Sequence, residues 1–397
     1  MRELSTQAFL QAMDICVQDT VDFLLFSGDL FNTSLPSLDT LKMVTKKLKE
    51  LNDRQIPVYV IAGSHDFSPS GKTMIDVLEQ AGLLKNVCRG TVHPETRQLH
   101  LHFTVDKKTG AKLTGILGRK GQLDRAYYEN LALEHLEREP GYKIFLFHTT
   151  LSEMKPVHLQ QVESHPVSFL PRRFGYYAGG HIHHRTEISL PDYGTLTYPG
   201  ALFPNSFAEV EKYGHGGFYM IAVEEGKQTL EWIPVKMREQ VALQVDCTGK
   251  SPEQVQQFLE ATAPQVQGKL VTLRFQGRLS TGRISDIPFS DIQEKLYGAG
   301  AYFVLRNTAE VQAEVLGEIK MIPEHPEALE EQIIQEHLRG SFFDREKELH
   351  LMRSLLTAFH IQKKEGETVT DFQRRVEQEG DQIISNYFPE QAPDRKL

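Results

Sequence analysis

The stretch that decides the fold is Asp22-Phe-Leu-Leu-Phe-Ser-Gly-Asp-Leu-Phe31, in which an apolar run ends in a glycine and an aspartate. A short apolar run bounded by polar residues predicts a buried strand, here Val21–Phe26. A second run of this kind, Pro57–Ile61, leads into Gly63-Ser-His-Asp66. Both strands are therefore followed by residues that can do chemistry, which is where open α/β sheets place their sites.

Helices are predicted between and around these strands, because apolar residues recur there at helical spacing. They cover Thr6–Asp19, a segment that begins at Pro36-Ser37, and Met74–Leu84. Alternation of apolar strands with amphipathic helices indicates an α/β fold with a layered core, a sandwich of sheets and helices.

Further strands are predicted downstream of these elements. They are a hairpin of Leu101–Val105 and Leu113–Ile116, strands at Lys143–Phe147 and Tyr176–Ala178, and a β-meander of Thr195–Tyr198, Gly217–Val223 and Thr229–Val235. The meander is expected to close the first domain, which then covers residues 1–238.

Two smaller parts follow the first domain. Residues 239–322 alternate strands and helices in a compact α+β pattern, and residues 323–397 are helical and charged. Within the last part, Arg345–Phe359 and a segment with Phe372, Val376 and Ile383 carry apolar residues at helical spacing. We expect the first of these parts to be a capping domain and the second to be an arm that binds a partner.

The composition is that of an ordinary globular protein, with 24% charged residues and a net charge of -9. Three cysteines without a CxxC motif predict reduced thiols, and no apolar run reaches the length of a membrane span. We therefore expect a cytoplasmic protein that does not bind membranes. The negative charge weighs against a nucleic-acid partner, although a metal site or a local basic stripe supplies positive charge at the point of contact.

Four motifs place a possible metal ligand directly after a predicted strand. They are Gly28-Asp29, Gly63-Ser-His-Asp66, His148 and Gly180-His-Ile-His183. Each motif alone is more often a turn or an ordinary histidine, but all four in this order favour a metal centre. Aspartate oxygen and histidine nitrogen suit manganese, iron or zinc better than calcium.

Two of these motifs suggest particular roles. A pair of metals about 3.5–4 Å apart needs a bridging carboxylate, and Asp29 is the natural bridge. His65 precedes Asp66, a pairing that suits a histidine oriented by a carboxylate and able to protonate a leaving oxygen. His100, His102 and two further histidines lack such a setting and are interpreted as ordinary.

These motifs together resemble the calcineurin-like metallophosphoesterases. More narrowly, Gly28-Asp-Leu-Phe31 and Tyr198-Pro-Gly200 are similar to elements of the SbcD/Mre-eleven nucleases, a family of DNA repair enzymes. The resemblance covers about residues 2–225, and the later parts match only in organisation: a capping domain and a helical C-terminal segment.

The resemblance implies a role for each motif. Asp29 would bridge two divalent metal ions, with Mn²⁺ as the expected ion. His148 and His181 would bind one ion and His183 the other. His65, with Asp66, would be the catalytic histidine. Ser64 stands where the family has a metal-binding asparagine and would be a weaker ligand.

One family motif, an Asp-x-His that supplies two ligands to the first metal, is not present in this sequence. The opening residues instead resemble the linker to the first helix, so the chain is expected to be truncated relative to the family. We expect the missing motif in coding sequence upstream and in frame, since loss of that strand would expose the core of the sheet.

The function implied by the resemblance is metal-dependent cleavage of DNA. The chain would be the exonuclease and endonuclease subunit of a double-strand-break repair complex, acting by a two-metal mechanism on DNA ends, single-stranded and double-stranded. An SbcC/Rad-fifty-type ATPase would bind the C-terminal arm, and a homodimer is compatible with this scheme. The alternative is a catalytically impaired DNA-end scaffold that has lost the first metal site. A phosphoesterase for small substrates would need neither the capping domain nor the arm.

Overall fold

The computed structural model describes residues 1–68, 71–156, 159, 161–262, 265–312, 344–359, 361–364, 367 and 369–388. The chain divides into two compact units, residues 1–314 and residues 315–397. The predicted boundary at residue 322 and the start of the predicted arm lie outside the described residues. The predicted boundary at residue 238 falls inside the first unit and stays a prediction.

The first sheet of the larger unit has three strands in the order β1-β2-β3. They are β1 (Leu24–Ser27), β2 (Val58–Ile61) and β3 (Lys85–Asn86), and all of them run parallel. Alternate residues of β2 face opposite sides, as the period of a strand requires. Val58 and Val60 belong to one core cluster, whereas Tyr59 and Ile61 belong to another, so this strand is buried on both faces.

The second sheet has six strands in the order β10-β11-β9-β8-β7-β6. They are β6 (Thr104–Val105), β7 (Lys112–Ile116), β8 (Lys143–Phe147), β9 (Tyr176–Gly179), β10 (Thr186–Ser189) and β11 (Thr195–Tyr198). The four central strands run parallel to one another. On β8, Ile144 and Leu146 join the cluster of Tyr59 and Ile61, so the two sheets pack face to face.

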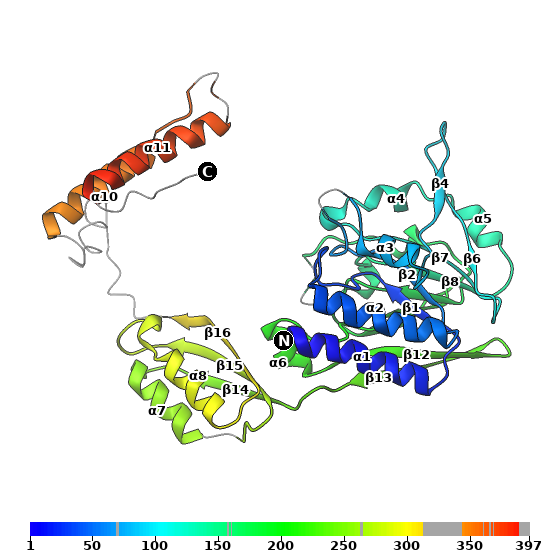
Figure 1. The fold of residues 1–397 in the computed structure, drawn as a ribbon, viewed down its shortest axis with the longest axis horizontal. Helices are drawn as coiled ribbons and strands as arrows, with labels where there is room; N and C mark the ends of the chain where they lie inside the picture. The colour runs from blue at the N-terminus through cyan, green and yellow to red at the C-terminus, as the bar shows by residue number, and fades with distance from the viewer. Residues whose placement is uncertain are drawn as a thin grey trace. The chain divides into compact units, whose positions relative to one another are not determined.

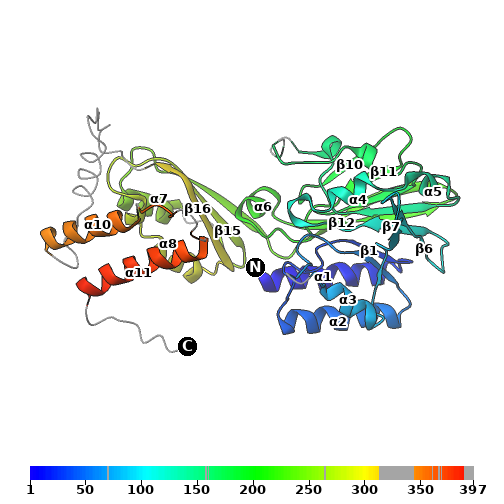
Figure 2. The ribbon, with the colours of Figure 1, turned by 90° about the horizontal axis from the view of Figure 1, so that it is seen from above.

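Helices cover the outer face of each sheet, which completes the predicted layered sandwich (Figures 1 and 2). On the first sheet lie α1 (Arg2–Gln18), α2 (Leu38–Asp53) and α3 (Met74–Gln80); on the second lie α4 (Arg125–Glu129) and α5 (Leu133–Arg138). The predicted start of α2 is confirmed, because the Ser37 hydroxyl caps it by accepting the amide of Thr40.

The predicted β-meander is wrong. β11 pairs with β9 and with β10, a strand that the sequence did not predict. The helix α6 (Phe207–Tyr213) then separates β11 from β12 (Gly216–Glu224) and β13 (Lys227–Val235), which form a hairpin of their own. Met220 of β12 packs in the core between the first sheet and its helices, and Ile221 packs in the core between the two sheets, so the hairpin contributes to both cores without extending the second sheet.

The hairpin predicted at Leu101–Val105 and Leu113–Ile116 is confirmed only in part. The strand predicted at Leu101–Val105 is two strands. Thr104–Val105 pairs with β7, whereas β5 (Leu99–Leu101) pairs with β4 (Gly90–Val92). Short 3₁₀ turns link other elements of this unit: η1 (Lys120–Gln122), η2 (Ser152–Met154), η4 (Val167–Phe169) and η5 (Ile284–Asp286).

The predicted α+β part forms a parallel three-stranded sheet with its own core. Its strands are β14 (Gln240–Asp246), β15 (Leu270–Arg278) and β16 (Phe303–Gln312), and its helices are α7 (Pro252–Thr262) and α8 (Phe289–Gly298). Apolar side chains of these strands and helices, among them Phe275 and Ile292, bury one another between the sheet and the helices.

The second unit contains the two predicted amphipathic helices, α10 (Arg345–Phe359) and α11 (Val369–Tyr387). They pack against each other, and the His350 ring lies 6.2 Å from the ring of Tyr387. His350 is near the start of α10 and Tyr387 ends α11, so the helices are antiparallel. No helix within the described ranges is long and apolar enough to cross a membrane.

A buried carboxylate joins the two sheets and allows a stability prediction. Asp106 is 2% exposed and accepts hydrogen bonds from the hydroxyl of Tyr59, at 2.8 Å, and from the amide and hydroxyl of Thr109. Burial acts to raise the pKa of Asp106, but these hydrogen bonds outweigh it, so the pKa lies below its ordinary value. The bonds to the charged carboxylate therefore stabilise the fold.

We expect Asp106→Ala to lower the free energy of unfolding by about 2–4 kcal/mol, because it leaves the buried Tyr59 hydroxyl without this partner. Asp53 at the end of α2, exposed at 60% and substituted by alanine, is the control and should change it by less than about 0.5 kcal/mol. Since the pKa is lowered in the folded state, the contribution of Asp106 is present above about pH 4 and fades as pH falls further. Denaturant unfolding at pH 7 checks the prediction, and equal effects of both substitutions would contradict it.

Candidate metal centre

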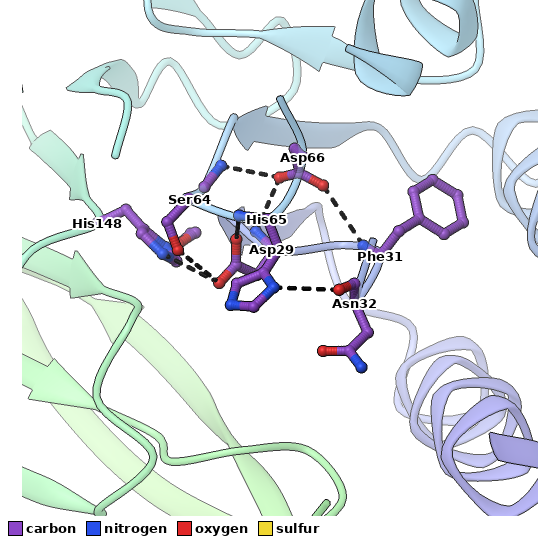
Figure 3. Close-up of polar contacts among 9 residues, drawn as sticks. Asp29, Phe31, Asn32, Ser64, His65, Asp66 and His148 are labelled. Carbon is purple, nitrogen blue, oxygen red and sulfur yellow. Dashed lines mark hydrogen bonds and ion pairs between the residues drawn. The ribbon is translucent and has the colours of Figure 1, made fainter. Parts of the chain in front are cut away.

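The four strand ends that carry the predicted ligand motifs meet where the two sheets face each other. The Ser27 hydroxyl at the end of β1 donates to the carbonyl of Ala178 in β9, at 2.8 Å. β1 also contacts β8, and so does β2. The loops that follow these strands therefore converge at one edge of the sandwich, and Figure 3 shows side chains from the loops after β1, β2 and β8.

Asp29 and His148 form the centre of this site. The His148 Nε2 lies 3.2 Å from Asp29 Oδ2, and the histidine side chain is 1% exposed. Its Nδ1 contacts the Ser27 carbonyl at 2.6 Å, and a carbonyl only accepts, so Nδ1 carries the hydrogen. Nε2 therefore faces a carboxylate oxygen. Such a contact is stable only with a positive charge at that point: a proton on the ring or a metal ion.

The Nε2 atom of His148 supports the second of these readings. It is buried and faces Asp29 Oδ2 at 3.2 Å, but within the described part of the chain no contact of this atom has the geometry of a hydrogen bond. A histidine whose other nitrogen donates to a backbone carbonyl is the usual arrangement of a metal ligand. The donor set therefore fits a divalent cation held by Asp29 and His148.

Two glycines make the close approach of these loops possible. A Cβ on Gly63 would lie 2.3 Å from both the amide nitrogen and Oδ1 of Asp29. A Cβ on Gly28 would lie 2.3 Å from His148 Nδ1, and the backbone there has a φ of +90°. The glycine in each predicted motif thus leaves the space that the neighbouring ligand occupies.

Asp29 is held by the loop that follows β2. Its Oδ1 accepts the amide of His65 at 2.7 Å, and its Oδ2 accepts the Ser64 hydroxyl at 3.4 Å. Burial acts to raise the pKa of Asp29, but the contacts with His148 and with the His65 amide outweigh it and lower the pKa. The φ of Asp29 is +54°, a conformation that is uncommon outside glycine and that concentrates at functional sites.

Asp66 does not have the partner that the sequence suggested. Its Oδ2 accepts the amides of Asp29, at 2.9 Å, and Gly63, at 2.8 Å, and its Oδ1 accepts that of Phe31. It therefore ties the loop after β1 to the loop after β2 (Figure 3). Burial, together with the nearby charge of Asp29, raises the pKa of Asp66 to about 6.

His65 is exposed at the rim of the site and is oriented by a different group. Its Nδ1 lies 3.1 Å from the carbonyl of Asn32, to which it donates (Figure 3). The sequence did not predict this role of Asn32, because a backbone carbonyl leaves no signal in a residue pattern. The hydrogen on Nδ1 leaves Nε2 as the atom that can exchange a proton with a substrate.

His181 lies beside His148, with 5.1 Å between the ring centroids. Burial, with the positive charge that His148 carries when protonated, lowers the pKa of His181 to about 4. The ring is therefore neutral at pH 7 and has a lone pair available. Among the described residues, no three His, Cys, Asp or Glu side chains are grouped closely enough to hold a metal ion as they stand. Asp29 and His148 are thus a pair of possible ligands that already lie in contact.

His183 contacts the carboxylate of Glu209, which the sequence did not predict. Its Nδ1 lies 2.9 Å from Glu209 Oε1, whose other oxygen accepts the amide of Asn205 at 3.1 Å. This hydrogen bond raises the pKa of His183, while burial opposes the rise. The available signal was Ser206-x-x-Glu209, a spacing that predicts a helix start but not the reach of Glu209 to His183.

Comparison with known proteins agrees with this geometry. Residues 4–185 match the calcineurin-like phosphoesterase family. The chain is 27% identical over 225 residues to the DNA double-strand break repair protein Mre11 of Methanococcus maripaludis, covering 54% of this chain and 55% of the relative. It is 28% identical over 247 residues to the Mre11 protein of Saccharolobus solfataricus, covering 60% and 59%.

A third relative is described only by its class. It is the uncharacterized metallophosphoesterase YhaO of Bacillus subtilis, 27% identical over 234 residues, with 58% of this chain and 53% of the relative covered. The chain thus spans about half the length of the curated relatives it matches.

The layered sandwich and the loops at its edge agree with a calcineurin-like phosphoesterase domain, which residues 4–185 match. Within that class the chain is similar to the Mre11 proteins, which supports a metallophosphoesterase of the Mre11/SbcD type. The predicted resemblance is therefore confirmed, and so is the predicted fold class.

Proposed function

We propose that this chain is the nuclease subunit of a DNA double-strand-break repair complex and hydrolyses DNA phosphodiester bonds. The observation that carries the proposal is the buried Nε2 of His148, which faces Asp29 Oδ2 at 3.2 Å without a hydrogen-bond partner in the described residues. A phosphoesterase fold with such a pair at its strand ends is suited to divalent-metal phosphoester hydrolysis.

The proposed metal centre holds two divalent ions, with Mn²⁺ as the preferred one. Asp29 would bridge them, His148 and His181 would complete one site, and His183 the other, with Ser64 as a weak additional ligand. When bound, such a pair of ions supplies an activated water and neutralises the charge that develops on the phosphate oxygens.

The chain's own residues would do the rest of the chemistry. His65 is exposed and has Nδ1 bound to the Asn32 carbonyl, which leaves Nε2 to take up a proton and pass it to the leaving oxygen of the cleaved bond. Asp66 would act indirectly, because its carboxylate fixes the two loops that carry Asp29 and His65. Residues 239–322 are proposed as the capping domain that positions the DNA.

The substrate and partner are inferred from the relatives. Two of them are DNA double-strand break repair proteins. We propose that this chain likewise acts on DNA ends, single-stranded and double-stranded, together with an SbcC/Rad50-type ATPase.

Cleavage of a labelled single-stranded DNA oligonucleotide tests the proposed reaction. We expect cleavage in Mn²⁺ and none after chelation with EDTA, with full activity restored by added Mn²⁺. His102 is exposed and was interpreted as an ordinary histidine, so the control variant His102→Ala should cut like the parent. DNA binding without any Mn²⁺-dependent cleavage would refute the nuclease proposal and favour the alternative, a DNA-end scaffold.

The C-terminal helices are proposed as the site that binds the ATPase. α10 and α11 pack on each other but leave apolar side chains exposed, namely Met352 at 39%, Phe359 at 59% and Ile384 at 45%. Two helices with apolar surface suit docking into a groove or a coiled coil. They also belong to a compact unit separate from the one that holds the metal centre.

We expect deletion of residues 340–397 to leave Mn²⁺-dependent cleavage of single-stranded DNA unchanged and to abolish association with the ATPase. In the full chain, the double variant Met352→Ser with Ile384→Ser should weaken association at least tenfold. Substitution of the exposed polar Gln378 by serine is the matched control and should not. Co-purification assays with the ATPase measure this, and undiminished association of the deletion variant would show that docking occurs elsewhere.

A further inference from the structure

The short helix α6 lies between a predicted metal ligand and the sheet of the α+β part. At its start Glu209 contacts His183, and at its end the Tyr213 hydroxyl lies 2.8 Å from Nδ1 of His184. The helix therefore holds two successive residues of the loop that follows β9. That loop also contains His181.

The opposite side of α6 is bound to β15. Arg274 donates to both carboxylate oxygens of Glu211, with Nε at 2.9 Å from Oε1 and Nη2 at 2.6 Å from Oε2. The Arg274 guanidinium also lies over the Phe207 ring, 5.2 Å from its centroid, and donates to Glu310 of β16. Both partners of the ion pair are largely shielded, with side-chain exposures of 18% for Arg274 and 19% for Glu211.

These contacts decide where α6 lies. It has seven residues, and helices shorter than about 12–15 residues are marginal by themselves, so tertiary contacts fix its position. A two-point hydrogen bond between guanidinium and carboxylate sets direction as well as distance. Val210 adds an apolar anchor, because it is fully buried in a cluster that also contains Leu270 of β15.

We propose that α6 is a positioning element through which the α+β part sets the orientation of His183. Arg274 holds the helix through Glu211, and the helix holds the imidazole through Glu209. A carboxylate on Nδ1 fixes the tautomer that leaves Nε2 free as a ligand, and loss of such a partner typically costs 10–100-fold in metal affinity. The inference rests on the proposed metal role of His183 and names Glu209, Glu211 and Arg274 as positioning residues.

Metal-free full-length protein with ¹⁵N-labelled histidine provides the first test. We expect the His183 ring signals of the parent to report a hydrogen on Nδ1. Both Glu209→Gln and Arg274→Gln should move these signals toward a mixture of tautomers. The rate of hydrogen exchange at the backbone amides of residues 180–185 and 207–213 should rise at least tenfold in Arg274→Gln. Arg274→Lys should restore part of the protection.

Two further variants keep the test decisive. Glu211→Gln breaks the same link from the helix side and replaces Arg274→Gln if that variant does not fold. Lys269→Gln is the matched control. It removes the ion pair between Lys269 and Glu239, 3.0 Å apart, which does not involve α6. Parent-like His183 signals and exchange in both Arg274→Gln and Glu211→Gln would overturn the proposal, and so would equal changes in the control.

A Mn²⁺ titration of the same variants connects the result to the metal. We expect Glu209→Gln and Arg274→Gln each to weaken the site that uses His183 by about 10–100-fold, and the double variant to be no weaker than Glu209→Gln alone. Additive losses would overturn the link through α6. A parent that binds no Mn²⁺ would instead refute the proposed metal centre, while the metal-free measurements would still decide whether α6 positions His183.

Discussion

Asp29→Asn is expected to reduce Mn²⁺ affinity more than about 100-fold and to abolish cleavage of DNA. Asn keeps the volume of the side chain but removes the negative charge that both proposed ions share. The loss should exceed the 10–100-fold typical of an outer-shell partner, because Asp29 is itself the proposed bridging ligand. The neighbouring contacts increase the effect, since Oδ2 faces the buried His148 Nε2 at 3.2 Å.

Isothermal titration with Mn²⁺, together with the oligonucleotide assay, measures both parts of this prediction. Asp22→Asn is the matched control, because Asp22 lies just before β1 and is 51% exposed. It should bind Mn²⁺ and cut DNA like the parent. If Asp29→Asn kept the Mn²⁺ content and activity of the parent, the assignment of Asp29 as the bridge between two metals would be wrong.

His65→Ala is expected to lower the rate of cleavage by about 10²–10⁴-fold and to leave Mn²⁺ affinity nearly unchanged. The side chain of His65 is exposed and bound to the Asn32 carbonyl, so its ring is not part of the Asp29 and His148 pair. Its backbone amide, which holds Asp29 Oδ1, is retained in the alanine variant.

The measurement compares single-turnover cleavage with Mn²⁺ content. An oligonucleotide with a bridging sulfur in place of the leaving oxygen at one bond provides the sharpest control, because a thiolate departs without a proton and should restore much of the lost rate. Loss of Mn²⁺ from His65→Ala would make His65 a ligand, and an unchanged rate would remove it from the reaction.

Much of the sandwich could be predicted because its strands are local apolar runs that end in polar motifs. β2 and β8 are buried on both faces, so their sequences are almost continuously apolar. β10 was missed because Thr186–Ser189 alternates half-buried and exposed residues and has no apolar run. The pairing of β11 could not be predicted from its own residues, since it depends on the burial of Leu196 and Tyr198 against distant parts of the second sheet.

The candidate site divides in the same way. Asp29, His148 and His181 stand next to strand ends and could be predicted as neighbours from that placement alone. The hydrogen bonds that orient them could not. The Asp66 carboxylate accepts hydrogen bonds from backbone amides rather than from the His65 ring. Glu209 contacts His183 from α6, the helix that follows β11. Such partners are set by tertiary packing, which a residue pattern does not encode.

The central claim is that Asp29, His148 and His181 form a divalent-metal site, and calorimetric titration of the purified chain with Mn²⁺ tests it most directly. Three strong ligands at this site and two at the site of His183 predict one tight and one weaker binding event. The tight event should disappear in His148→Ala and persist in His183→Ala. Absence of Mn²⁺ binding, or a tight event that survives His148→Ala, would contradict the account.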